Sequence, residues 1–171
     1  MPLTAPVSIS NQAGQIALVL QGYAQSAGGV ADVVSNLRDL WFQASQSSQK
    51  PRILICYNGE SARGDFSVAN YNHRVDRQWI VAVTRGRGWL ANRGDSLYKT
   101  TTQDPLYDVV EEVRELLRCM IGISEEFPID FKRISPMNSQ NKALDAYAIE
   151  FSTANDIPEI IANIPNPITQ L

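Results

Sequence analysis

A long amphipathic helix, predicted over residues 104–121, constrains the fold of this chain more than any other sequence feature. Asp104 can cap its first turn, Pro105 suits the first helical position, and Gly122 is a natural stop. Its apolar residues recur every three or four positions and form one face: Leu106, Val109, Val110, Val113, Leu116, Leu117, Met120 and Ile121. The opposite face is charged. Because an apolar face of this length must be covered, we expect the helix to pack on a sheet.

Strand-like runs lie on both sides of this helix. Residues 52–57 are apolar on both faces, as expected of a strand inside a sheet, and residues 75–84 are predicted to pair with them in antiparallel fashion. Residues 129–135 and 144–152 are predicted to form a second hairpin. Three side chains of the last strand are expected to face the helix: Tyr147, Ile149 and Phe151.

The N-terminal region predicts a first helix over residues 11–26, with Asn11 as its cap. The next apolar run, residues 30–41, fits a helix, but residues 30–34 are β-branched enough to form a short strand, and the sequence leaves both possibilities open. The predicted order is α-β-β-α-β-β, with extensions at both ends. The predicted fold class is therefore α+β, with helices packed on one face of an antiparallel sheet.

Size and charge narrow the possible classes of protein. A chain of 171 residues that is 44% hydrophobic fits a single domain, with a core at about 12–152 and a C-terminal extension at 153–171. The 15 basic and 18 acidic residues give a net charge of −3, which argues against general attraction to nucleic acid or to an anionic membrane. We expect neither a signal peptide nor a membrane span. Cys56 and Cys119 are interpreted as reduced core thiols.

No residue pattern predicts catalysis. Gly59 and Gly64 have the spacing of a phosphate-binding loop, but an acid and a phenylalanine replace the lysine and hydroxyl that must follow. His73 is the sole histidine and has no cluster of metal ligands beside it. Two Arg-Gly-Asp tripeptides, beginning at Arg63 and Arg93, are too short to indicate a receptor ligand. We therefore expect no enzymatic activity, no cofactor and no metal.

A long loop is predicted over residues 85–103, because this segment exceeds an ordinary hairpin connection. Its candidate functional residues are four cations and one aromatic residue: Arg85, Arg87, Trp89, Arg93 and Lys99. The favoured interpretation is a partner-docking loop that contacts an acidic protein surface or faces a DNA-filled channel without gripping the DNA. The alternative is that the loop binds single-stranded nucleic acid by stacking on its bases. A single tryptophan provides little aromatic surface for such stacking.

An apolar arm is predicted at the C-terminal end, over residues 157–171. Its candidate interface residues are five isoleucines: Ile157, Ile160, Ile161, Ile164 and Ile168. Pro158, Pro165 and Pro167 argue against a sheet strand. We expect this arm to lie extended in a groove outside the core of its own subunit, since so many isoleucines are unfavourable in water.

The order of these elements and several local patterns resemble the tail-terminator (tail-completion) proteins of long-tailed bacteriophages, over about residues 12–152. The segments that carry the resemblance are the helix Gln12 to Gln25, the strand KPRILICY at 50–57, the strand RQWIVAV at 77–83, the helix Tyr107 to Ile121, and the strand LDAYAIEF at 144–151. The region 28–49 and the Ile-Pro extension depart from the family pattern.

The resemblance implies a structural protein of the virion tail or neck, present in the host cytoplasm during assembly. It implies a homo-oligomeric, hexameric ring that caps the tail tube and contacts the tube protein on one side. A head-completion or connector protein would bind the other side, and DNA would be only passing cargo in the ring lumen. The resemblance implies no enzymatic activity. Two alternatives remain, namely another neck or baseplate adaptor of the same fold, and a single-stranded nucleic-acid binding module.

Overall fold

A mixed five-stranded sheet and three helices make up the part of the chain that the computed structural model describes, which comprises residues 8–26, 29–46, 50–62, 72–86, 106–120, 129–137 and 144–158. The elements follow one another in this order: α1 (Ile9–Ser26), β1 (Val30–Val34), α2 (Leu37–Ala44), β2 (Arg52–Ala62), β3 (Asn72–Gly86), α4 (Leu106–Arg118), β4 (Asp130–Pro136) and β5 (Leu144–Pro158).

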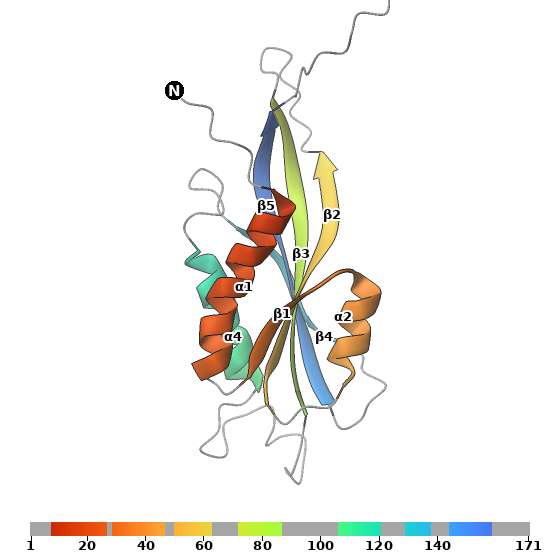
Figure 1. The fold of residues 1–171 in the computed structure, drawn as a ribbon, viewed down its shortest axis with the longest axis vertical. Helices are drawn as coiled ribbons and strands as arrows, with labels where there is room; N and C mark the ends of the chain where they lie inside the picture. Colours follow the sequence, from red (N-terminus) through yellow and green to blue (C-terminus); the bar gives the residue numbers. More distant parts are fainter. Residues whose placement is uncertain are drawn as a thin grey trace, which may run out of the picture.

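The strands lie side by side in the order β1-β2-β3-β5-β4. The predicted antiparallel pairing of β2 with β3 and the predicted hairpin of β4 with β5 are both confirmed. Strands β3 and β5 pair over their whole length, from Asn72 opposite Pro158 to Gly86 opposite Leu144. Figure 1 shows α1 and α4 on one face of the sheet and α2 on the other.

The predicted fold class is right in combining helices with a sheet, but wrong in two respects. The sheet is mixed, because residues 30–34 form a strand that pairs in parallel with β2. Helix α2 covers the opposite face, so the helices do not all share one face. The predicted order α-β-β-α-β-β consequently lacks β1 and α2. A single apolar run encodes both elements, and the break between them comes from the cap at Asn36, whose side chain accepts a hydrogen bond from the Asp39 amide.

Both long helices have slightly different bounds from those predicted. Helix α1 begins at Ile9, since Ser8 rather than Asn11 caps it: the Asn11 amide donates to the Ser8 hydroxyl at 3.1 Å. Helix α4 ends at Arg118 rather than at residue 121, and the Met120 amide closes the last turn on the Leu117 carbonyl at 3.2 Å. Residues 104, 105 and 121 lie outside the described part of the chain.

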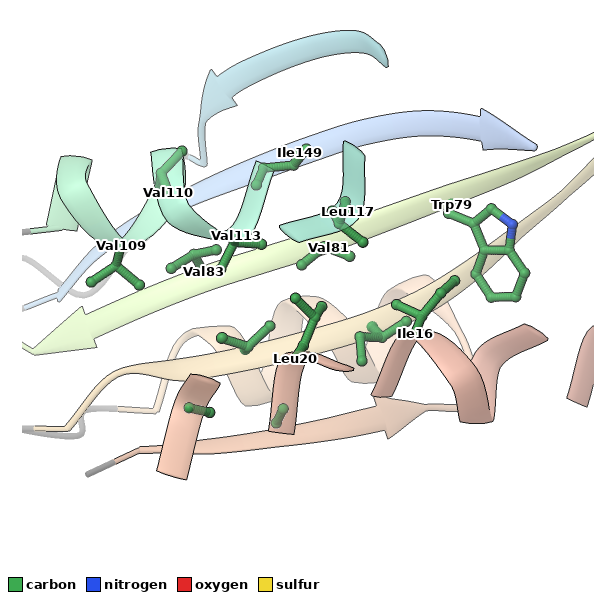
Figure 2. Packing of buried hydrophobic residues seen from close by; sticks show 14 of the residues in the cluster. Ile16, Leu20, Trp79, Val81, Val83, Val109, Val110, Val113, Leu117 and Ile149 are labelled. Carbon is green, nitrogen blue, oxygen red and sulfur yellow. The ribbon is translucent and has the colours of Figure 1, made fainter. Parts of the chain in front are cut away.

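The main core lies between α1, α4 and the sheet, and Figure 2 shows its interdigitated side chains. The predicted apolar face of α4 is confirmed, because Val109, Val113 and Leu117 are fully buried. They meet buried residues of α1, β3 and β5: Ile16, Leu20, Val81, Val83, Ile149 and Phe151. Tyr147 also faces α4 as predicted, and its hydroxyl lies 2.9 Å from the Tyr107 hydroxyl.

A smaller core lies under α2. Leu40 and Ala44 pack there on the reverse side of the sheet, against Leu54 and Cys56 of β2 and Ala82 of β3. This second cluster explains why residues 52–57 are apolar on both faces. It also explains why a short helix of eight residues is stable, since burial rather than helix propensity holds it in place.

The last strand extends further than predicted. Strand β5 continues past residue 152 to Pro158, whose partner in β3 is Asn72. The prediction that the prolines exclude this segment from a sheet is therefore wrong at Pro158. A proline is tolerated at the end of a strand, because its missing N–H leaves no acceptor on the neighbouring strand without a partner. Ile157 belongs to the sheet, and residues 153–158, which were predicted to start the C-terminal extension, are part of β5. The remaining residues of the predicted arm lie outside the described part.

We predict that Val113→Asp prevents folding. The substitution places an unpaired carboxylate in the main core, which costs several kcal/mol. Glu112→Asp is the matched control, since Glu112 is exposed on the same helix and its substitution should leave the thermal melt nearly unchanged. Circular dichroism melts of both variants decide the matter, and a parent-like melt for Val113→Asp would contradict the assigned core.

Candidate functional site

The described surface carries several large apolar side chains that no described element covers. They are Leu18 of α1, Val30 and Val33 of β1, Trp41 and Phe42 of α2, and Ile134 of β4. Leu18 is 72% exposed and Phe42 is 65% exposed. Single exposed apolar residues are ordinary, but adjacent aromatic residues on an outward helix face are typical of protein interfaces. Each of these surfaces is therefore a candidate contact.

The outward face of α2 combines a cation with two aromatic rings. Arg38, Trp41 and Phe42 are three and four positions apart, so they lie on one side of the helix, and all three are exposed. Trp and Arg are the residue types that dominate binding energy in protein interfaces. The helix is held firmly, because the Arg52 guanidinium donates to the Gln43 carbonyl at 3.2 Å and Asn36 caps its start. A partner would thus meet a pre-organised surface.

The outward face of α1 is uncharged. Helix α1 has 18 residues and contains no Asp, Glu, Lys or Arg, although its outer side is open. Helices that face only water usually carry charges on that side. Leu18 lies at the centre of this face, surrounded by glutamine and glycine. Depletion of charge around an exposed leucine favours contact with another protein surface over contact with water alone.

The two edges of the sheet differ in their protection against further pairing. Strand β4 has an extra residue at Lys132 that shifts its register, and Pro136 ends it. Lys132 and Arg133 form ion pairs with Asp130 and Glu150. Bulges, cations and prolines are the usual means of blocking an edge strand. Strand β1 has none of these features, and no described strand pairs with its outer side.

A buried polar network joins the start of α1 to the first half of β3 and the second half of β5. The Arg77 guanidinium donates to the Gln12 side-chain oxygen at 2.8 Å, and the Gln12 amide donates to Asn155 Oδ1 at 2.5 Å. Asn155 in turn donates to Thr153, whose hydroxyl also accepts from the Trp79 indole at 3.1 Å. All five residues are at most 8% exposed. The network thus holds the second half of β5 against α1 and β3.

The charge of Arg77 is balanced at the edge of this network. Its Nε lies 3.6 Å from a Glu60 carboxylate oxygen. A β-bulge in β2 brings Glu60 into register with Arg77, and Gly59 accommodates the bulge with a φ of 102°. Burial, assisted by the Glu60 carboxylate, raises the pKa of Tyr57, so its hydroxyl stays protonated at neutral pH. The arrangement stabilises a strand end and provides no activated nucleophile.

The described residues give little support for catalytic or metal chemistry. Cys56 is a buried core thiol as predicted; burial raises its pKa, and the Asp39 carboxylate adds to that shift. The prediction is wrong for Cys119, which is exposed just after the last turn of α4. Within the described ranges no group of three His, Cys, Asp or Glu side chains could hold a metal ion. None of the described helices combines the length and apolarity needed to cross a membrane. The expectation of no enzymatic activity stays a prediction.

The structure places only part of the residues predicted to form contacts. Arg85 is half-buried near the end of β3, whereas Arg87, Trp89, Arg93 and Lys99 lie outside the described residues. Among the arm residues, only the backbone of Ile157 is described, in β5; Ile160, Ile161, Ile164 and Ile168 lie outside.

Sequence reasoning missed the α2 surface and the polar network. The signal for the surface is the adjacent pair of aromatic residues, Trp41 and Phe42. A helix whose buried face holds Leu40 and Ala44 must turn both aromatic rings outward. No local sequence pattern indicates the polar network, because its residues come from distant parts of the chain. Gln12 and Asn155 are 143 residues apart in the sequence.

We predict that Gln12→Ala lowers the free energy of unfolding by about 1–3 kcal/mol, because the buried Arg77 and Asn155 groups lose their partners. Gln15→Ala is the matched control: Gln15 is exposed on the same helix, so its loss should be nearly neutral. Urea unfolding measures both. Equal stability of the two variants would show that the network contributes nothing.

Comparison with known proteins does not identify a family. A scan against protein-family models gives no match, and a search of curated protein sequences gives no significant match.

Proposed function

We propose that this protein is a self-assembling structural protein of a bacteriophage tail, which forms a ring that terminates the tail tube and joins it to the head-completion or connector complex. The single observation that supports the proposal best is the pair of unlike contact surfaces on opposite sides of the sheet. The uncharged face of α1 around Leu18 lies on one side, and the Arg38, Trp41 and Phe42 face of α2 lies on the other (Figure 1).

Unlike surfaces on opposite sides favour head-to-tail association. If the α1 face of one subunit meets the α2 face of the next, each subunit uses two different patches, and the contact is heterologous. Heterologous contacts produce rings when the rotation between neighbours closes, and filaments when it does not. Exposed Leu18 on one side and two aromatic rings on the other supply the desolvated centre that such an interface requires.

The two ends of the sheet offer further contacts for two different partners. Because β3 and β5 are antiparallel and pair over their whole length, the chain leaves β3 after Gly86 at one end and leaves β5 after Pro158 at the other. The basic loop 87–103 follows the first exit, and the isoleucine-rich arm follows the second. In a ring built from such subunits, the basic loops would lie on one side and meet a tube or connector protein. The arms would start at the opposite ends of the sheets and reach neighbouring subunits.

The alternatives use the same surfaces differently. A neck or baseplate adaptor of this fold would also assemble through α1 and α2, but it would bind other virion proteins. A single-stranded nucleic-acid binding module would depend on the basic loop alone. The net charge of −3 and the uncharged face of α1 both disfavour the nucleic-acid module.

We predict that the purified protein sediments as one multimer of defined mass and that Leu18→Glu shifts it to monomer, because an exposed carboxylate would be buried in the α1 contact. Ser10→Glu is the matched control. It adds the same charge to an exposed position in the first turn of the same helix, two turns from Leu18, so retention of the multimer would show that position rather than charge matters. A parent that stays monomeric at all concentrations would contradict the proposed ring.

We predict that replacing Arg87 and Arg93 with Ser leaves the melt unchanged but weakens partner docking, since loop cations mainly set electrostatic fit and association rate. Complementation of a phage lacking the gene, scored by tail length and head joining, provides the readout. Normal tails would remove the loop from the interface. Lost binding to a single-stranded oligonucleotide at low salt, with normal tails, would instead favour the nucleic-acid module.

A further inference from the structure

Strand β1 presents an open row of hydrogen-bonding groups at the edge of the sheet. The Val30 amide donates to the Pro51 carbonyl at 3.2 Å, so Val30, Asp32 and Val34 direct their backbone groups toward β2. Backbone groups alternate sides along a strand, and those of Ala31 and Val33 therefore point away from the sheet. No described strand pairs with this outer side.

The side chains of β1 suit a strand of apolar residues. Val30 and Val33 are each 49% exposed, and because they are three positions apart they lie on opposite faces of the strand. A further strand beside β1 would cover apolar surface on both faces. As described above, β1 also lacks the bulge, cations and proline that block β4.

The chain itself contains a segment of the right kind. Residues 159–164, Glu-Ile-Ile-Ala-Asn-Ile, contain three isoleucines and neither proline nor glycine. Pro158 and Pro165 bracket the segment, so any strand that it forms is limited to six residues. Strand β1 has five residues, and the two lengths match.

The segment cannot reach β1 of its own subunit. The register places Val34 level with Glu150 in β5, eight residues before Pro158, which corresponds to about 27 Å along the strands. The outer side of β1 lies four strand spacings from β5, or about 19 Å. Glu159 follows Pro158 directly, and even Ile164 reaches only about 20 Å from it. The diagonal of about 33 Å exceeds that reach, so the acceptor must belong to another copy.

We propose that residues 159–164 of one copy add as a sixth strand to the open edge of β1 in a second copy. Main-chain hydrogen bonds to Ala31 and Val33 supply the pairing, and the isoleucines cover Val30 and Val33. The inference rests on the proposed ring and names the contact that fastens neighbouring subunits. This contact is heterologous, because each subunit accepts an arm at its own β1 and places its own arm on β1 of the next subunit.

Substitutions at Val33 test the main-chain pairing. Val33→Pro removes an amide that points outward and leaves every hydrogen bond to β2 in place, so the fold should persist and the multimer should be lost. Val33→Thr is the matched control, since it keeps the amide and the β-branched shape and should keep the multimer. Sedimentation velocity compares both with the parent. A multimer of parental mass in Val33→Pro would overturn the proposal.

Disulfide cross-linking keeps the proposal testable even if Val33→Pro does not fold. In a Cys119→Ser background, one protein carries Val33→Cys, and a second carries Ile160→Cys, Ile161→Cys, Ala162→Cys or Asn163→Cys in turn. Oxidation of the mixture should give a covalent heterodimer for at least one arm position, and a partner bearing Gln15→Cys in place of Val33→Cys should give none. Failure of all four positions would overturn the proposal.

The proposed function and this inference can fail separately. Cross-linked multimers that do not bind tail tubes would refute tube termination and would support the β1 contact. Rings that cap tubes without any cross-link would retain the function and refute the contact.

Discussion

The full-length pairing of β3 with β5 is the constraint on which the rest of this structure depends. Fifteen residue pairs hold the two strands together, and each face of the pair supports a separate core. Helices α1 and α4 pack on one face through Val81, Val83 and Ile149, while α2 packs on the other through Ala82 and Ala148. The same pairing places Gly86, the last residue of β3, and Pro158, the last residue of β5, at opposite ends of the sheet.

The two faces lead to different outer surfaces. A helix that buries Ile16 and Leu20 leaves Leu18 on its open side, and a helix that buries Leu40 leaves Trp41 and Phe42 outside. The buried polar network holds the second half of β5 against α1 and β3. Core packing thus sets the geometry of every surface that we assign to assembly.

Elements with a strong local signal could be predicted from the sequence, whereas those defined by distant contacts could not. The apolar periodicity of α4 and the antiparallel pairing of β2 with β3 are confirmed, since each depends on patterns within one or two segments. The sequence of residues 30–34 alone fits either a helix or a strand. The segment is a strand because it pairs in parallel with β2. The extension of β5 to Pro158 was missed because its partner, Asn72, lies in a polar stretch without a strand pattern. For the candidate site, the isoleucine-rich composition of the arm can be recognised in the sequence. The strand edge proposed to accept it cannot, because only the order of the strands shows that β1 lies at an edge.

Cryo-electron microscopy of the protein mixed with purified tail tubes is the direct test of the proposed ring. We expect a closed ring of subunits seated on one end of each tube, with adjoining subunits in contact through α1 and α2. Tubes with bare ends, or protein bound along the tube wall without a ring, would contradict it.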